Sequence, residues 1–226
     1  MSLDASAGGF PPVHRWPPDG PIAVGGDLSV ERLVAAYAQG IFPWPASPGP
    51  RGLLWWSPDP RAILDPAKLH VPRRLERTLR SGGFELSLDR SFAAVVRGCA
   101  VSGTRRGNTW ITPAMAGAYA RLHAAGIAHS IEVWREGRLA GGLYGVCLGG
   151  MFAGDSMFSL ERDASKVALV ALVRRLAARG CGLFDVQMLT PHLATFGAEE
   201  VPRGEFLERL HAARALPRCW PDDGSV

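Results

Sequence analysis

Several features that mark common classes of protein are missing from this 226-residue sequence. The four cysteines lie dozens of residues apart without a Cys-x-x-Cys pair, and the six histidines form no His-Glu-x-x-His pattern. Disulfide frameworks and zinc sites need closer spacing, so we expect free thiols and no bound metal. The first ten residues lack the basic and apolar regions of a secretory signal. The longest purely apolar run, Val167–Val173, is far shorter than the roughly 20 residues that span a bilayer, so we expect a cytoplasmic protein without a membrane segment.

Signatures of nucleotide- and coenzyme-binding enzymes are missing as well. The sequence contains neither a P-loop nor a Gly-x-Ser-x-Gly elbow. A coenzyme A acetyltransferase holds the pyrophosphate of its coenzyme on backbone N–H groups of a glycine-rich loop at a helix start. Here the corresponding segment, residues 156–166, contains no glycine and carries two acidic residues. These residues disfavour coenzyme A, and we expect no cofactor.

What the sequence does contain indicates a folded protein with one basic region. Apolar residues make up 47% of the chain, which excludes disorder for its bulk. The 25 Lys and Arg exceed the 21 Asp and Glu by four. Nine of those cations lie between Pro66 and Trp110, against three acids, so this segment carries +6 and the remainder −2.

The basic segment opens with a predicted helix that carries an arginine stripe. At 100° per residue, Arg73, Arg77 and Arg80 share one face, opposite apolar residues such as Leu75 and Leu79. A solvated helix face explains this pattern, and so does a surface that follows the phosphates of a nucleic acid. The sequence leaves both interpretations open.

Turn signals and hydrophobic periodicity divide the chain into two parts. We place a boundary near Pro60, giving a small N-terminal domain of residues 1–60 and a second domain of residues 61–226. A capped helix is expected over residues 30–39. The second part predicts a hairpin (130–135 and 138–147), a strand (151–154), a buried helix (163–179), a strand (183–188) and an amphipathic helix (203–214). Because a helical crossover usually returns the chain parallel to the preceding strand, this order predicts a mixed sheet.

Two strand ends carry polar side chains that could form a site. Strand alternation places Asp185 and Gln187 on one face of the predicted strand 183–188. Asp155 is expected at the end of the preceding strand, so parallel neighbours would bring Asp155 and Asp185 together. Apolar surroundings disfavour ionisation unless a cation or amine stands nearby, which suits a site that receives an amino group. For Asp185 and Gln187, a hydrogen-bonded pair in the core is the alternative.

Tryptophans flank the basic segment. Trp44, Trp55, Trp56 and Trp110 offer indole faces that stack well on unpaired bases, although packing in the core or between the domains is the more common reason for any one of them.

Eight blocks of sequence together resemble the bacterial leucyl/phenylalanyl-tRNA–protein transferase family. They are Gly25–Ser29, Gly40–Trp44, Leu54–Arg61, Thr109–Thr112, His129–Trp134, Gly141–Val146, Asp155–Ser159 and Asp185–Gln187. The resemblance implies an α+β or α/β domain with a mixed sheet of the acetyltransferase-like (GNAT) fold, lacking its coenzyme, behind a small N-terminal domain. It implies transfer of Leu, Phe or Met from aminoacyl-tRNA to proteins that begin with Arg or Lys, which marks them for N-degron proteolysis. We further expect a monomer.

The resemblance also implies roles for individual residues. The 3′-terminal adenosine of the tRNA would contact Trp44 and Trp110. An apolar pocket for the transferred side chain would be lined by Leu143, Phe152, Leu169, Leu172 and Phe184. The tRNA backbone would meet the arginine-rich helix, which carries Arg73, Arg74, Arg77 and Arg80. The family usually has Glu where this chain has Asp155, whose side chain is about one methylene shorter.

The chemistry suggests how the carboxylates could act. The aminoacyl ester is already activated, so the reaction needs an unprotonated amine held against the ester carbonyl. We hypothesise that Asp185, oriented by Gln187, takes the proton of the attacking amine while Asp155 positions an amino group. Two other functions stay open: a coenzyme A-dependent GNAT-type acyltransferase and a non-catalytic tRNA-binding module.

Overall fold

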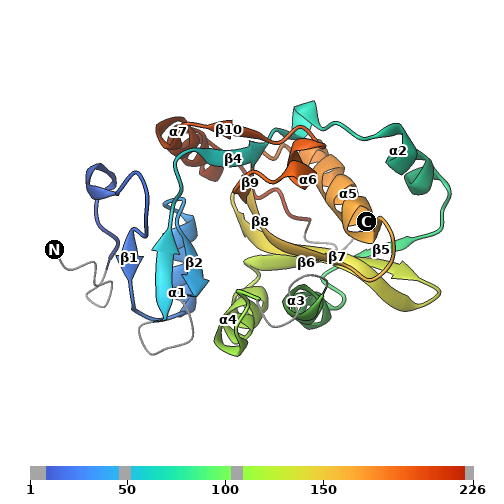
Figure 1. The fold of residues 1–226 in the computed structure, drawn as a ribbon, viewed down its shortest axis with the longest axis horizontal. Coiled ribbons are helices and arrows are strands. Elements are labelled where there is room, and N and C mark those ends of the chain that lie inside the picture. The colour runs from blue at the N-terminus through green and yellow to red at the C-terminus, as the bar shows by residue number, and fades with distance from the viewer. Residues whose placement is uncertain (1–8, 46–51, 103–108, 222–226) are drawn as a thin grey trace.

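The computed structural model describes residues 9–45, 52–102 and 109–221, which build two β-sheets (Figure 1). The smaller sheet is antiparallel, with strand order β1-β3-β2. Its strands are β1 (Ala23–Val24), β2 (Phe42–Pro45) and β3 (Leu53–Trp56). The short 3₁₀ helix η1 (Val13–Arg15) precedes this sheet in the chain, and α1 (Val30–Tyr37) connects β1 to β2.

The two ends of helix α1 are set by a capping residue and by a glycine. The Ser29 hydroxyl accepts a hydrogen bond from the Arg32 N–H, and Asp27 accepts one from the Ser29 N–H at 2.9 Å. The helix stops before Gly40, whose φ of 74° favours glycine. The predicted helix over residues 30–39 is therefore confirmed to within two residues.

The larger sheet has seven strands in the order β10-β4-β9-β8-β7-β6-β5. They are β4 (Arg61–Leu64), β5 (Glu85–Leu88), β6 (Ala128–Arg135), β7 (Arg138–Leu148), β8 (Met151–Ser159), β9 (Leu183–Gln187) and β10 (Glu199–Val201). Neighbours are antiparallel except β8 and β9, which are parallel and are linked by a helix. The predicted mixed sheet is confirmed.

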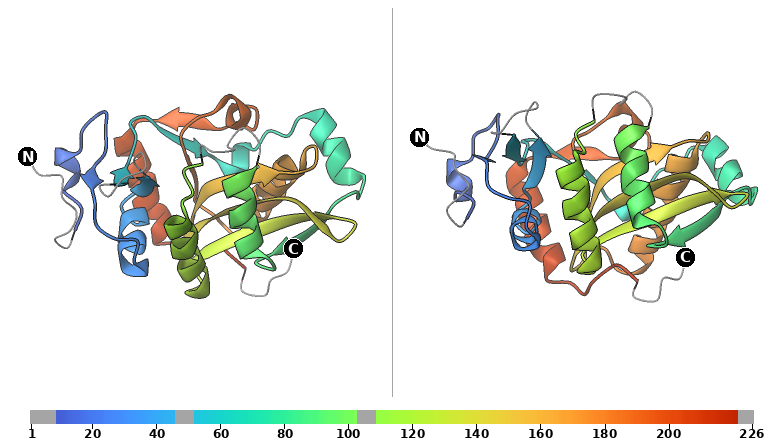
Figure 2. Two further views of the ribbon diagram at one scale, coloured as in Figure 1. Left: turned by 60° about the horizontal axis from the view of Figure 1, so that its bottom comes forward. Right: turned by 90° about the horizontal axis from the view of Figure 1, so that it is seen from below.

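Helices cover both faces of the larger sheet. They are α2 (Arg73–Arg80), α3 (Phe92–Val101), α4 (Pro113–Ala124), α5 (Ala164–Ala178), α6 (Pro191–Ala194) and α7 (Arg203–Arg214), with the 3₁₀ helix η2 (Pro66–Lys68). Helix α5 lies on one face, and α3 and α4 lie side by side on the other (Figures 1 and 2). Each face has its own apolar core: Val95 and Met115 belong to the core under α3 and α4, whereas Leu169 and Phe152 belong to the core under α5.

Strand β8 differs from the prediction in length and in regularity. The expectation that Asp155 ends this strand is wrong, because β8 continues to Ser159. In the pairing with β7, Tyr144 lies opposite Ser156 and Gly145 lies opposite Gly154, so Asp155 is an extra, unpaired residue. This β-bulge reverses the alternation of side chains: Ala153 and Phe158 face one core, while Phe152 and Met157 face the other.

The state of the cysteines and the lengths of the helices can be described for the residues that the structure covers. All four cysteines are free and buried, so the expectation of free thiols is confirmed. In the described part of the chain, no helix combines the length and the apolar character that crossing a membrane requires.

Candidate functional site

A cavity of about 550 Å³ lies where β8 and β9 separate. The parallel pairing of these strands ends at Ala153 and Asp185. After this last pair, the segments that follow Ala153 and Asp185 move apart, and their side chains and backbone line the space between them. The cavity is lined by Phe42, Trp44, Trp110, Leu143, Gly154, Asp155, Ser156, Met157, Leu169, Phe184, Val186, Gln187, Met188, Thr190, His192 and Leu193.

The apolar wall of the cavity contains three of the five residues expected there. Leu143, Leu169 and Phe184 line it. Phe152 and Leu172 do not: both are fully buried in the core under α5, behind the wall. Further apolar surface comes from residues that the sequence did not single out for the pocket, namely Phe42, Met157, Val186, Met188 and Leu193.

Trp44 and Trp110 lie together at the cavity although 66 positions separate them in the chain. Their rings stack in parallel, with centroids 5.5 Å apart and planes inclined by 12°. Trp55, by contrast, is fully buried and serves the core of the small sheet. The structure thus separates an indole pair at the cavity from an indole that packs inside.

Asp155 is held by two tyrosines that sequence reasoning missed. The Tyr37 hydroxyl donates to Asp155 Oδ1 at 2.5 Å and lies 2.7 Å from the Tyr119 hydroxyl. Asp155 Oδ2 is buried and has no hydrogen-bond partner among the described residues. Burial raises the pKa of Asp155 to about 8, despite the opposing hydrogen bond from Tyr37. This carboxyl group is therefore mostly protonated at neutral pH.

Asp185 forms a buried ion pair instead of facing the cavity. Arg61 Nε and Nη2 donate to its two carboxylate oxygens at 2.8 and 2.6 Å, and both side chains are almost completely buried. The Gln187 backbone N–H also donates to Asp185 Oδ1, at 3.0 Å. Asp185 is not among the residues that line the cavity. With both oxygens bound to a guanidinium, it is poorly placed to take a proton from a substrate.

Gln187 is the buried amide at the cavity. The hydrogen-bond network assigns its side-chain nitrogen as donor to the carbonyl oxygens of Gly154 at 3.0 Å and Val186 at 3.1 Å. Both N–H groups are then used, and the amide oxygen is left to accept a hydrogen bond. The backbone of Gln187 has φ of 60°, so the chain turns sharply at this residue.

The arginine-rich helix α2 lies beside α5 (Figure 1), and none of its residues is among those that line the cavity. Its four arginines, Arg73, Arg74, Arg77 and Arg80, are exposed, while Leu75 is buried. Glu76 lies 3.8 Å from the Arg80 guanidinium and 3.0 Å from that of Arg174. Two further cations of the basic segment, Arg105 and Arg106, lie outside the described residues.

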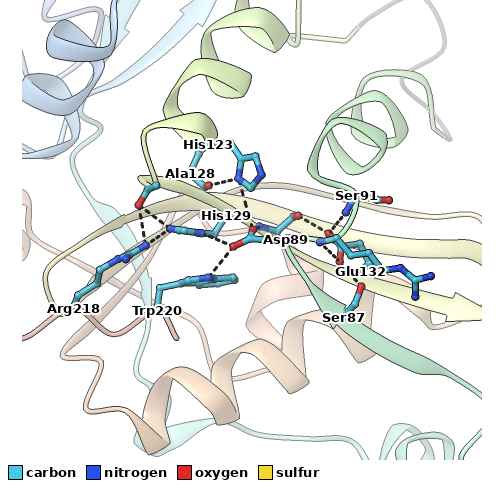
Figure 3. Close-up of polar contacts among 12 residues, drawn as sticks. Ser87, Asp89, Ser91, His123, Ala128, His129, Glu132, Arg218 and Trp220 are labelled. Atoms are coloured by element: carbon cyan, nitrogen blue, oxygen red, sulfur yellow. Dashed lines mark hydrogen bonds and ion pairs between the residues drawn. The ribbon is translucent and has the colours of Figure 1, made fainter. Parts of the chain in front are cut away.

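A second polar cluster lies under the C-terminal segment, and Figure 3 shows its contacts. Within the described residues, Asp89, His123 and His129 are the group whose ligand atoms lie close enough to share a metal ion. His129 Nδ1 lies 2.7 Å from Asp89, and Arg218 donates to His129 Nε2 at 2.7 Å. His123 Nδ1 lies 2.8 Å from the Ala128 carbonyl oxygen, and the Trp220 indole N–H donates to Asp89 at 3.0 Å. Through Arg218 and Trp220, these hydrogen bonds attach the C-terminal segment to the sheet, which is a structural role.

Comparison with known proteins gives consistent similarities. The profile of the leucyl/phenylalanyl-tRNA protein transferase family matches residues 63–211, and that of the family's N-terminal domain matches residues 26–59. The leucyl/phenylalanyl-tRNA–protein transferase of Thiobacillus denitrificans is 54% identical over 212 residues, covering 92% of this chain and 91% of that protein. The one from Anaeromyxobacter sp. (strain K) is 56% identical over 209 residues, covering 92% and 88%. A solved GCN5-related N-acetyltransferase-like protein from Streptococcus suis is 12% identical with a TM-score of 0.37, covering 76% of this chain and 63% of that chain.

Proposed function

The chain belongs to the leucyl/phenylalanyl-tRNA–protein transferase family of aminoacyltransferases, and from this we propose that it transfers Leu, Phe or Met from aminoacyl-tRNA to the N-terminal amino group of an acceptor protein. The observation that carries the proposal is the composition of the cavity between β8 and β9. An apolar wall, an indole pair and a buried amide meet there, as a substrate made of an acyl side chain, a nucleoside and an amine requires.

The apolar wall suits the side chain of the transferred amino acid. Leu143, Leu169 and Phe184 offer only hydrocarbon surface to the cavity, with Met157 among the same lining residues. Such a pocket discriminates weakly between apolar side chains, because one methylene there is worth only about 1–3 kcal/mol. Acceptance of Leu, Phe and Met by one pocket follows from this. The flexible thioether of Met157 further allows the wall to fit side chains of different shape.

The indole pair suits the 3′-terminal adenosine. Trp44 and Trp110 present stacked aromatic surface to the same cavity, so an adenine that stacks on this surface brings its ribose ester toward the apolar wall. The exposed arginines of α2 supply positive charge for the phosphates of the tRNA at a distance from the cavity.

Gln187 and Asp155 suit the attacking amine. The free amide oxygen of Gln187 can accept a hydrogen bond from the amine. Asp155 is a second polar residue that lines the cavity, and its buried Oδ2 has no hydrogen-bond partner among the described residues. The ion pair with Arg61 gives Asp185 a positioning role, since its carboxylate fixes the Gln187 backbone by a hydrogen bond at 3.0 Å. This replaces the hypothesis that Asp185 itself takes the proton of the amine.

The further features of the family extend the proposal. The acceptors begin with Arg or Lys, and the added residue marks them for N-degron proteolysis. The ester bond of aminoacyl-tRNA supplies the driving force for amide formation, so the transfer consumes no ATP. We expect the protein to act as a monomer in the cytoplasm.

One assay tests the proposal directly. Radiolabelled phenylalanyl-tRNA is incubated with a peptide that begins in Arg, and label in the peptide is expected. The same peptide with an acetylated N-terminus is the matched control and should stay unlabelled. Transfer of acetyl groups from acetyl-coenzyme A instead of amino acids would favour the coenzyme A-dependent acyltransferase. Equal binding of charged and uncharged tRNA without transfer would favour a binding module.

A further inference from the structure

The proposed transfer needs a proton acceptor that the site described above does not supply. Only an unprotonated amine attacks an ester, yet an α-amino group has a pKa of about 7.7–8.0 and arrives largely protonated at neutral pH. Among the residues that line the cavity, the titratable side chains that change charge near neutral pH are Asp155 and His192. One of them, or bulk water, must take the proton.

The two aspartates near the cavity are poor proton acceptors. Asp155 is already mostly protonated at neutral pH, because burial raises its pKa to about 8. Asp185 has both carboxylate oxygens bound to Arg61 and does not line the cavity. His192 is therefore the lining side chain whose unprotonated form is available.

The environment of His192 leaves its imidazole free. The residue lies on the short helix α6, five positions after Gln187, and the Thr190 hydroxyl caps this helix by accepting from the Leu193 N–H at 3.1 Å. Its ring packs edge-on against Phe196, with centroids 5.2 Å apart. Within the part of the chain that the structure describes, the imidazole makes no hydrogen bond and no ion pair. It is only partly buried, so its nitrogens can meet both a ligand in the cavity and solvent.

We propose that His192 accepts the proton of the acceptor's α-ammonium group and so generates the amine that attacks the aminoacyl ester. This inference rests on the proposed function, and it adds a residue with a defined chemical task. The turn at Gln187 places the amide that would hold the amine and the imidazole that would deprotonate it on one short stretch of chain, both facing the same cavity.

The charged groups around the imidazole favour its neutral form. Burial and the positive charge of Lys166 on α5 both lower the pKa of His192 from its ordinary value. Lys166 is itself paired with Asp163 at 2.7 Å. Asp155, across the cavity on β8, is mostly neutral and offers the imidazole little countercharge. At pH 7 His192 is thus ready to accept a proton.

The proton balance of the step is simple. The ammonium group gives one proton to the imidazole, and the amine nitrogen then forms a bond to the ester carbonyl carbon. The bond between that carbon and the ribose oxygen breaks, and the ribose oxygen receives the second proton that the nitrogen loses. The products are an amide and a free ribose hydroxyl group, and the imidazolium releases its proton to solvent. No further reactant is required.

The test compares His192→Ala and the shape-conserving His192→Asn with wild type, at saturating acceptor peptide across pH 5.5 to 9.5. Loss of a general base lowers kcat by about 100-fold or more. The acid limb of the kcat profile is expected to move from below about 6.5, set by the imidazole, to about 8, set by the amine itself. Added imidazole should restore part of the rate in His192→Ala. His211→Gln, on an exposed face of α7, is the matched control and should behave as wild type.

Two results would overturn the proposal. One is a wild-type kcat and acid limb in both variants. The other is a lower kcat with an unmoved acid limb and no response to imidazole, which would mean that His192 acts only through packing. A wild-type enzyme that transfers no amino acid would instead contradict the proposed function, so the two failures are distinguishable.

Discussion

Arg61 donates hydrogen bonds from Nε to Asp185 Oδ1 at 2.8 Å and from Nη2 to Asp185 Oδ2 at 2.6 Å, although the two residues are 124 positions apart in the chain. The same guanidinium donates to the Gly40 carbonyl oxygen at 3.0 Å and lies over the rings of Phe42 and Phe206. One buried cation therefore connects the small sheet, strand β9 and helix α7. Because Asp185 in turn holds the Gln187 backbone, this ion pair joins the framework of the protein to its candidate site.

The first prediction concerns the stability of this ion pair. Arg61→Met leaves the buried Asp185 carboxylate without its cation, which should cost about 3–5 kcal/mol in the free energy of unfolding. The double variant Arg61→Met/Asp185→Leu removes both charges and should be less destabilised than the single variant. Urea denaturation measures both. Glu199→Gln breaks the exposed pair with Lys68 and serves as the control, with an expected cost below about 1 kcal/mol. Equal costs for the single and double variants would contradict the prediction.

The second prediction concerns the pH dependence that Asp155 imposes. Its folded-state pKa of about 8 exceeds the ordinary value of 3.8, so between these values the native state binds more protons than the unfolded state. Stability then falls as pH rises from about 4 to 8, by at most about 1.4 kcal/mol per unit, and levels off above. Asp155→Asn removes this slope.

The measurement is the free energy of unfolding of wild type and Asp155→Asn in urea at pH 5, 6, 7, 8 and 9. The advantage of wild type over the variant should shrink up to pH 8. Asp163→Asn is the control: hydrogen bonding to Lys166 lowers the pKa of Asp163, so its contribution is lost only in acid and its effect should be constant over this range. A constant difference between wild type and Asp155→Asn would rule out the raised pKa.

The third prediction concerns the indole pair. If adenine stacks on Trp44 and Trp110, then Trp44→Ala or Trp110→Ala should weaken binding of a 3′-aminoacyl-adenosine by roughly 5- to 150-fold, because base–aromatic stacking is worth about 1–3 kcal/mol. Calorimetric titration measures the Kd. Trp134→Ala is a matched control, since that indole packs beside Arg90 and donates to Ser87 away from the cavity. Undiminished affinity in both cavity variants would exclude the contact.

The fourth prediction concerns the arginine stripe. Neutralising Arg73, Arg77 and Arg80 together should weaken tRNA binding and reduce the slope of log K against log salt by about two to three. The control variant neutralises three arginines outside this helix, Arg138, Arg179 and Arg209, with the same change in net charge. An unaltered slope in the variant without Arg73, Arg77 and Arg80 would mean that this face of α2 is exposed to solvent and does not contact the tRNA phosphates.

The sequence predicts those helices and strands that are determined by residues close together in the chain. The hairpin of β6 and β7 follows from its turn, where Glu136 and Gly137 both adopt positive φ. Helix α7 follows from its amphipathic spacing and was located to the residue. Strand β4, by contrast, was not anticipated, because it is four residues long and begins with a buried cation. Only a partner 124 positions away makes Arg61 acceptable inside the protein.

The candidate site divides in the same way. Trp44, Trp110 and Gln187 lie in sequence blocks that resemble the family, and all three line the cavity. The hydrogen bond between Tyr37 and Asp155 could not be predicted, because Tyr37 lies 118 positions earlier in the chain and its place in α1 indicates only a buried residue. The resemblance predicts Phe152 and Leu172 at the pocket, but alternation along a strand or helix does not distinguish a residue of the pocket wall from one buried a layer deeper.

The extra residue in β8 has a consequence for how this site can change over evolutionary time. Deleting Asp155 would restore a regular pleat and would leave the later side chains of the strand on their present faces, because Ser156 would still pair with Tyr144 and Gly154 with Gly145. No point mutation has that effect. Libraries built only from replacements will therefore keep an extra residue at this point of the strand, and moving its side chain relative to the cavity calls for insertions or deletions.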